Sequence, residues 1–341
     1  MNKNNKKYKI AIDVMGGDFA PLNEIKGAIR AYNNKPENID LQIFLVGKKD
    51  LIETQLKELG NPEFAYEIVH ADEVITMKDD PTDALKNKKN SSLYMGVDLV
   101  KEGKADAFVS AGNTGAVLAT STVLLGRIEG VSRPTIGSFF PGVQKSVFVL
   151  DVGANSDCKP NFLYDFAVMG SIYLKKILGI DNPKVGLLSI GEEESKGNSL
   201  VIETHQLLKK SNLNFAGNIE GRDILISDCD IVVCDGFVGN IILKFAESIL
   251  TLLKAKFKDY ADKSLVNKLK IGVSLPTVKN VLSDFDYQNY GGVPLLGTNG
   301  VIIIGHGKSS DLAIQNMILK AVEAVEKEVN KEILIAIKNN S

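Results

Sequence analysis

Short apolar runs of β type alternate along the chain with longer segments whose apolar positions recur at helical spacing. Strands are expected at residues 8–14, 41–46, 65–69, 106–109, 135–140, 146–150, 185–190, around 215, at 231–234 and at 301–304. Helices are expected at residues 22–33, 49–59, 92–102, 114–125, 161–178, 241–259, 265–285 and 311–337. A further helix is expected between the strand at 185–190 and residue 208, where it ends. Residues 71–90 are charged and irregular, and Pro141-Gly142 separates two apolar runs as in a hairpin.

This alternation predicts an α/β fold with a doubly wound, mostly parallel sheet. The chain contains no Pro- or Ser-rich linker that would divide it. We therefore expect a single α/β catalytic domain over residues 1–341, with a helical hairpin inserted at 246–285.

Seven of the apolar runs end in a short loop rich in Gly, Asn and Asp. The loops are DVMGGD (13–18), SAGNTGA (110–116), DVGAN (151–155), GEEESKGN (191–198), GNIEGRD (217–223), DGFVGN (235–240) and GHGKSS (305–310). In a parallel sheet such loops lie together at the carboxyl ends of the strands, where ligands bind. Glycine lets backbone N–H groups approach a ligand, and helix N-termini favour anions. The sequence thus predicts a large anion-binding cleft.

Composition narrows the class of protein. The 341 residues are 44% hydrophobic, with a formal net charge of -2 and a pI near 6.0, which argues against a nucleic-acid-binding protein. Cys158, Cys229 and Cys234 lack CxxC spacing, so a zinc site or disulfide framework is not expected and a reducing cytosol fits best. We expect no signal peptide, because the basic N-terminal segment lacks an apolar core, and no apolar run approaches the about 18–20 residues that span a bilayer. A soluble protein, able to lie on a membrane surface, is expected.

Several sequence motifs are absent: the dinucleotide fingerprint, Walker A, the G-x-S-x-G elbow and the H-E-x-x-H zinc helix. Neither a metal nor an organic cofactor is therefore expected. His306 and Asp311 match the His-x4-Asp spacing of glycerol-phosphate acyltransferases. The alternative is that Ser309 or Ser310 caps the last helix and Asp311 interacts with its dipole.

The loops, in their order, resemble the bacterial phosphate acyltransferase family, also called acyl-ACP:phosphate transacylases. The motifs that carry the resemblance are IAIDVMGGDFAP (10–21), KKNSS (88–92), SAGNTGA, DVGAN, CDGFVGNIILK (234–244) and YGGVPLLG (290–297). The resemblance implies a homodimer whose fold is similar to phosphotransacetylases and isocitrate-dehydrogenase-like proteins. It implies transfer of a long-chain acyl group from acyl carrier protein to inorganic phosphate. The acyl phosphate would feed phospholipid synthesis through a glycerol-phosphate acyltransferase.

This chemistry needs two anions held together and an oxyanion stabilised, more than it needs a strong base. His306 is the candidate proton shuttle, and Lys196 supplies charge to a second anion-binding loop. The other candidate catalytic residues are Asp235, Asn240 and Lys244, of which the last two lie one helical turn apart. The candidate substrate- and phosphate-binding residues are Asp13, Gly16, Gly17, Asn90, Gly112, Asn113, Thr114, Asn155, Gly191, Asn198, Asn218 and Gly239. For each residue, a turn, a cap or a solvated side chain is the alternative interpretation.

The segment 249–275 is basic and amphipathic. Leu265, Val266 and Leu269 form an apolar stripe, and Lys268 is one of the lysines beside it. A basic amphipathic helix can lie in a membrane interface or receive an acidic carrier protein. We expect a projecting hairpin that does both, in a cytoplasmic protein attached peripherally to the membrane; a dimer contact is the alternative.

Three other functions remain open from the sequence. One is a phosphotransacetylase acting on short acyl-CoA. Another is a non-catalytic, membrane-associated scaffold for lipid synthesis. The third is a dehydrogenase, against which the missing dinucleotide fingerprint argues.

Overall fold

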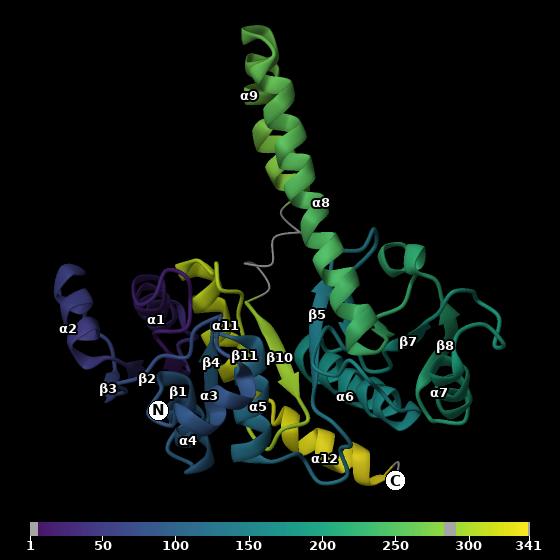
Figure 1. The fold of residues 1–341 in the computed structure, drawn as a ribbon, viewed down its shortest axis with the longest axis horizontal. Helices are drawn as coiled ribbons and strands as arrows, with labels where there is room; N and C mark the ends of the chain where they lie inside the picture. The colour runs from purple at the N-terminus through teal and green to yellow at the C-terminus, as the bar shows by residue number, and fades with distance from the viewer. Residues whose placement is uncertain (1–5, 283–290, 340–341) are drawn as a thin grey trace.

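One sheet of eleven strands runs through the molecule (Figure 1). The computed structural model describes residues 6–282 and 291–339. The strands are β1 (Lys6–Asp13), β2 (Ile39–Gly47), β3 (Tyr66–His70), β4 (Ala107–Ser110), β5 (Thr135–Phe140), β6 (Val147–Leu150), β7 (Lys184–Leu188), β8 (Asn214–Ile219), β9 (Ile231–Val233), β10 (Val293–Leu296) and β11 (Val301–Ile304). Their order in the sheet is β3-β2-β1-β4-β11-β10-β5-β6-β9-β7-β8.

The direction of the strands changes at the centre of the sheet. The pairs from β3 to β11 are parallel, as are those from β6 to β8. Between them, β10 is antiparallel to both β11 and β5, and β5 is antiparallel to β6. The mostly parallel α/β sheet and the β5–β6 hairpin are therefore confirmed. The strands of one parallel half run in the opposite direction to those of the other half.

Helices cover both faces of this sheet. They are α1 (Leu22–Asn34), α2 (Lys49–Glu58), α3 (Pro81–Asn87), α4 (Ser92–Lys101), α5 (Thr114–Leu125), α6 (Pro160–Leu178), α7 (Ser199–Lys209), α8 (Gly236–Asp262), α9 (Leu265–Leu282), α11 (Asp311–Glu326) and α12 (Val329–Asn339), with a 3₁₀ turn at Gly221–Leu225. Helices α4, α5 and the base of α8 pack on one face. On the other face, α1, α2 and α11 cover one half and α6, α7 and α12 the other. Burial of strand side chains on both faces explains why these strands read as continuous apolar runs.

The structure differs from the sequence prediction at α3, at the last helix and at β10. Asp80 accepts hydrogen bonds from the amides of Thr82 and Asp83, and with Pro81 in the first turn it starts α3 in the region expected to be irregular. The expected last helix is two helices, because Glu328 adopts a φ of 52° between α11 and α12. Strand β10 was missed.

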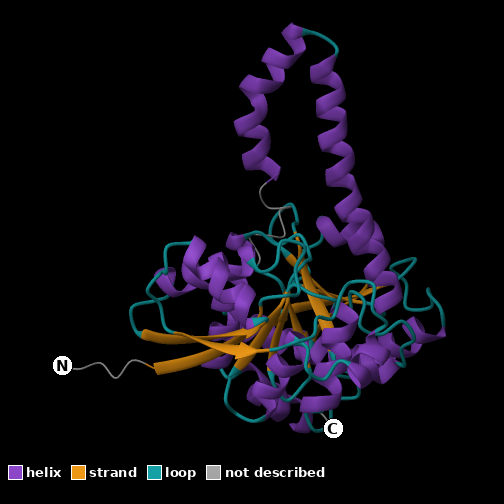
Figure 2. Ribbon diagram, turned by 60° about the vertical axis from the view of Figure 1, so that its left-hand side comes forward, coloured by secondary structure: helices purple, strands orange, loops and turns teal. Residues whose placement is uncertain are grey.

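Helices α8 and α9 form a hairpin that stands away from the sheet (Figures 1 and 2). The expected boundary at 285 lies outside the described residues, and α8 begins at Gly236 rather than at 241. Contrary to expectation, α8 is long and apolar enough, by length and composition alone, to cross a membrane. Its first turn, however, is built into the sheet domain, where Gly236 and Gly239 are buried.

Candidate functional site

The turns that follow β1, β4 and β11 are packed directly against one another. The amide of Asp18 donates a hydrogen bond to the carbonyl of Gly307 at 2.7 Å. A Cβ on Gly16 would lie only 2.9 Å from the amide nitrogen of Gly112. These three strands are neighbours in the sheet, so their glycine-rich turns meet at one edge, at distances that larger residues would prevent.

Asp13 holds two of these turns together. Its carboxylate is 2% exposed and accepts hydrogen bonds from the Ser110 hydroxyl at 2.9 Å and the Met15 amide at 3.1 Å. Burial raises the pKa of Asp13, while the hydroxyls of Ser92 and Ser110 lower it. Its place beneath the turns makes it a structural support rather than part of a cavity wall.

A second pair of turns joins the end of β6 to the start of α8. The buried carboxylate of Asp151 accepts the amides of Ala154 at 3.0 Å and Asn155 at 2.7 Å. The amide of Gly236 then donates to the Asn155 carbonyl at 2.8 Å. A Cβ on Gly239 would lie 1.9 Å from the Asp151 carbonyl oxygen, so glycine lets α8 start in contact with this turn.

A cavity of about 360 Å³ lies between these two sets of turns, under α5 and α8. Four of the predicted site residues line it: Thr114, Asn240, Lys244 and His306. Its apolar wall is formed by Leu118, Ile136, Phe139, Val152, Leu243, Val293, Ile304 and Ala313. Because strand direction reverses at β10, the cavity lies across the face of the sheet, from the end of β11 to the end of β6.

One face of α8 forms a side of this cavity. Asn240, Leu243, Lys244 and Glu247 all line it, as their helical spacing requires. The ammonium of Lys244 lies 2.9 Å from the carboxylate of Glu247. The predicted common orientation of Asn240 and Lys244 is thus observed, and the lysine charge is shared with a carboxylate that the sequence analysis did not select.

The loop after β11 orients His306 toward this cavity. Its Nδ1 accepts the amide of Lys308 at 3.1 Å, so a neutral ring carries its hydrogen on Nε2. Asp311 does not work with His306 here, because its carboxylate pairs with Arg30 at 3.0 Å. The hydroxyl of Ser310 caps α11, in agreement with the capping interpretation of this segment.

Other predicted residues lie on the opposite side of α8. A second cavity of about 580 Å³ is lined by Asn198 and Asp235, together with Val238 and other apolar side chains. Asp235 caps α8 by accepting the Val238 amide at 2.9 Å, and Asn198 caps α7 in the same way. Lys196 is exposed in the loop that begins at Gly191 and leads into α7. The structure therefore does not bring Lys196, Asn198 or Asp235 together with His306.

Two further candidate asparagines have structural partners. Asn218 is buried, lies 2.9 Å from the ring of His205 and donates to the Glu193 carbonyl at 2.9 Å. The backbone amide of the exposed Asn90 donates to the carboxylate of Glu73 at 3.1 Å. Neither asparagine lines the cavity that contains His306.

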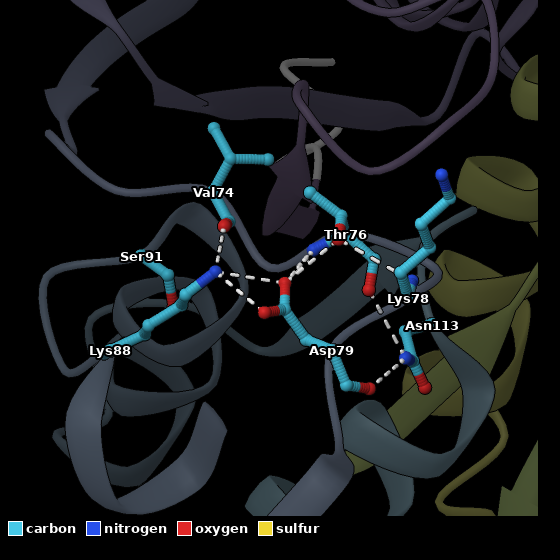
Figure 3. A network of polar contacts seen from close by, with 7 residues as sticks. All are labelled: Val74, Thr76, Lys78, Asp79, Lys88, Ser91 and Asn113. Carbon is cyan, nitrogen blue, oxygen red and sulfur yellow. Dashed lines mark hydrogen bonds and ion pairs between the residues drawn. The ribbon is translucent and has the colours of Figure 1, made fainter. Parts of the chain in front are cut away.

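A polar network braces the segment before α3 against the start of α5 (Figure 3). The Lys88 ammonium donates to both carboxylate oxygens of Asp79, at 2.8 and 2.9 Å, and to the Val74 carbonyl at 3.0 Å. The hydrogen bonds that Asp79 accepts from Lys88 and from the amide and hydroxyl of Thr76 lower its pKa to about 2. The side-chain amide of Asn113 donates to the backbone carbonyls of Thr76 and Asp79. Asn113 therefore holds this segment in place and also caps α5.

Several residues that line the cavity or support it were not among the candidates predicted from the sequence. Ser138 and Ser309 line it, and Glu24 is buried beneath the turn after β1. Ser138 is a hydroxyl residue in the middle of the otherwise mostly apolar strand TIGSFF, and this is the sequence signal available for it. Glu24 gives no signal, because its burial depends on packing against distant loops.

The cysteines do not form a reactive centre in the described part of the chain. Burial raises the pKa of Cys158 to about 11, and it raises the pKa of Cys234 well above the ordinary value. Both thiols therefore stay protonated near neutral pH. Within residues 6–282 and 291–339, no group of three or more His, Cys, Asp or Glu side chains is placed to hold a metal ion.

Comparison with known proteins places the chain in a family. The family model described as "Fatty acid synthesis protein" matches residues 8–332. The phosphate acyltransferase of Heliobacterium modesticaldum is 48% identical over 319 residues, covering 93% of this chain and 94% of that protein. The phosphate acyltransferase of Nostoc sp. is 45% identical over 328 residues, covering 95% of each.

Solved structures show the same fold. A phosphotransacetylase from Streptococcus pyogenes has a TM-score of 0.59 and 18% identity, covering 94% of both chains. The EutD phosphotransacetylase from Staphylococcus aureus has a TM-score of 0.58 and 15% identity, covering 94% of this chain and 95% of that one. The chain belongs to the phosphate acyltransferase family and is an acyltransferase with the fold of the phosphotransacetylases.

Proposed function

We propose that this enzyme transfers a long-chain fatty acyl group from acyl carrier protein to inorganic phosphate. The product is an acyl phosphate that a glycerol-phosphate acyltransferase would consume in phospholipid synthesis. The observation that carries this proposal is the cavity between the two sets of turns. It combines an extended apolar wall with Thr114, Asn240, Lys244 and His306.

The reaction is a displacement at a thioester carbonyl. A phosphate oxygen attacks the carbonyl carbon, the tetrahedral intermediate collapses, the C–S bond breaks, and the carrier thiolate takes up a proton. Phosphate is already anionic, so the enzyme's main task is to hold it and to stabilise the new oxyanion. The Lys244 ammonium and the Asn240 side-chain amide supply donors for these oxygens. The Nε2–H of neutral His306 donates a hydrogen bond to the leaving thiolate, which takes its proton from solvent.

The direct test is a phosphate-dependent assay of free thiol released from palmitoyl carrier protein. Asn240→Ala and Lys244→Met should each lower kcat/KM by roughly 10²–10³, the usual cost of losing one oxyanion donor. Lys101→Met is the matched control, because Lys101 is an exposed lysine at the end of α4, away from the cavity. Near-wild-type turnover in both cavity variants would remove them from the site.

The same assay separates the two cavities. From the sequence, Lys196→Ala is predicted to lower kcat/KM as severely as Asn240→Ala. If Lys196→Ala is severe while Asn240→Ala is mild, the reacting centre lies at the second cavity and the roles given above are wrong. If the reverse holds, the cavity with His306 is the site.

A short-chain phosphotransacetylase is the competing enzyme, because the solved structures of similar fold carry that name. The apolar wall of eight side chains favours a longer chain. Rates with palmitoyl carrier protein and acetyl-CoA, compared at equal phosphate, decide between the two. Tight binding of the carrier without phosphate-dependent thiol release would instead indicate a scaffold.

We also propose that the α8–α9 hairpin attaches the enzyme to the cytoplasmic membrane surface and receives the acidic carrier. Leu265 is 81% exposed, Leu269 is 71% exposed, and Val266 and Lys268 beside them are exposed as well. An apolar tip flanked by lysines suits both a lipid interface and an acidic protein. Replacing Leu265, Val266 and Leu269 by Ser should abolish sedimentation with anionic vesicles; unchanged sedimentation would contradict the proposal.

We also propose that the protein is a homodimer. Phe245, Ile249 and Leu252 are exposed along α8 at spacings of four and three residues, which is the spacing of a helix-packing seam. Sedimentation velocity of the wild type and of Phe245→Ser/Ile249→Ser should show a dimer and a monomer, respectively. A wild-type monomer at micromolar concentration would refute the dimer.

A further inference from the structure

Glu24 lies in the first turn of α1 and is only 1% exposed. Its carboxyl fills the space beside Gly17, where a Cβ would lie 2.2 Å from Glu24 Oε1. The backbone groups of Glu24 and Gly17 hydrogen-bond to it, but Oε2 is buried without a partner. An unpaired oxygen costs much more on a buried carboxylate than on a neutral acid, because the charge must also be desolvated.

The charged surroundings of Glu24 oppose ionisation. The negative groups that act on it are Asp13 at the end of β1 and Asp18 in the turn. Arg30, further along α1, has its charge committed to Asp311 of α11 at 3.0 Å. Burial, followed by the repulsion from Asp13 and Asp18, raises the pKa of Glu24 to about 8. The loop after β11, which contacts the turn, carries two more titratable groups, His306 and Lys308.

Glu24 supports the turn that contacts the His306 loop. Gly17 lies between the Glu24 carboxyl and the Gly307 carbonyl, and the next residue, Asp18, donates to that carbonyl at 2.7 Å. The neighbouring Asn23 donates to the Ser309 carbonyl at 3.0 Å. His306 and Ser309 both line the cavity, so α1 and its turn form the rear support of that loop.

We propose that Glu24 is a positioning residue that acts as a neutral carboxylic acid, holding the Gly16–Gly17 turn against the His306 loop until it ionises. Once ionised, it places a third carboxylate beside Asp13 and Asp18, behind the loop whose His306 and Ser309 line a cavity that must accept phosphate. That charge repels the anion and weakens the packing of Gly17. The inference rests on the proposed function, and it adds a pH response to that site.

The test compares kcat/KM of the wild type and Glu24→Gln in the thiol-release assay from pH 6.5 to 9.5. The amide has nearly the shape of the neutral acid but cannot ionise. The ratio of variant to wild type should rise roughly tenfold between pH 7 and pH 9, as the neutral fraction of a group with a pKa of about 8 falls. Using this ratio cancels the titration of phosphate and carrier. Glu63→Gln, at an exposed glutamate, is the matched control and should give a constant ratio.

A constant ratio for Glu24→Gln would show a merely structural role and overturn the proposal. If Glu24→Gln does not fold, Glu24→Met is the second neutral variant; its ratio to wild type must also rise with pH, from a lower starting value.

The fate of the proposed function is read separately. Absence of phosphate-dependent thiol release in the wild type refutes that function. Protection of the folded state by inorganic phosphate, measured as a Tm increase at pH 7 and pH 9, then still tests Glu24. The wild type should lose this protection at pH 9 while Glu24→Gln keeps it, and equal loss in both proteins would overturn the proposal.

Discussion

Asp151→Ala removes a buried carboxylate that holds the turn after β6, and its effect on stability follows from the hydrogen bonds that it loses. Asp151 is 0% exposed, and its two oxygens accept five hydrogen bonds. The donors are the amides of Ile136 at 3.2 Å, Gly153 at 3.3 Å, Ala154 at 3.0 Å and Asn155 at 2.7 Å, and the Asn155 side chain at 2.8 Å.

The cost follows from where these donors lie. The Ile136 amide is buried, so losing its acceptor costs about 1–3 kcal/mol; the loop amides can reach water and cost less. Burial of the Asp151 carboxylate is itself unfavourable, as its raised pKa indicates. Removing the carboxylate removes this penalty, which offsets part of the loss. We therefore expect Asp151→Ala to lower the free energy of unfolding by about 3 kcal/mol. Asp151→Asn, which keeps the shape and one acceptor oxygen, should cost about 1–2 kcal/mol.

Urea unfolding followed by circular dichroism at pH 7 measures both values. Asp157→Ala, at an exposed aspartate in the same loop, is the control and should change stability by less than about 0.5 kcal/mol. A loss under about 1 kcal/mol in Asp151→Ala would refute the reasoning. The Gly153 backbone lies near Asn240, so the loss of stability should be accompanied by lower kcat/KM.

Three further predictions use other parts of the site. Because its pKa is raised from 4.5 to about 8, Glu24 contributes stability that is full below pH 4.5 and is lost as pH rises through 8; relative to Glu24→Gln, urea unfolding should show wild type losing about 5 kcal/mol between those limits, and equal pH dependence would contradict this. Phe139→Leu, which shortens a residue of the cavity wall, should raise kcat/KM for palmitoyl carrier protein relative to that for lauroyl carrier protein; an unchanged ratio would place the acyl chain elsewhere. Lys88→Met should cost about 1 kcal/mol at pH 7, an advantage that the wild type loses as pH falls from 3.8 through 2 and that acid titration of unfolding measures.

Local sequence information was sufficient for most of the fold and for part of the site. Strand runs such as 301–304 and 147–150 are continuous and apolar because both faces of the sheet are covered. The prediction that Asn240 and Lys244 face one cavity needed only the helical repeat. Caps could also be read locally, as at Ser310.

Residues whose position depends on distant contacts could not be predicted in this way. Lys196 and Asp235 look as suitable for catalysis in the sequence as Lys244 does, yet they lie away from the His306 cavity. The separating element is α8, whose two faces line different cavities. Glu24 resembles a surface residue of an amphipathic helix until the turn at Gly17 covers it.

The sequence by itself determined the periodicity of the helices and strands, the glycine-rich turns and the family. Tertiary structure decided which turns share a cavity, because the strand direction reverses at β10 and α8 then divides the sheet face. It also decided which carboxyl groups are buried, among them those of Asp13, Glu24 and Asp151. Both depend on contacts between segments far apart in the chain, such as the 2.7 Å hydrogen bond between Asp18 and Gly307, and local patterns do not encode such contacts.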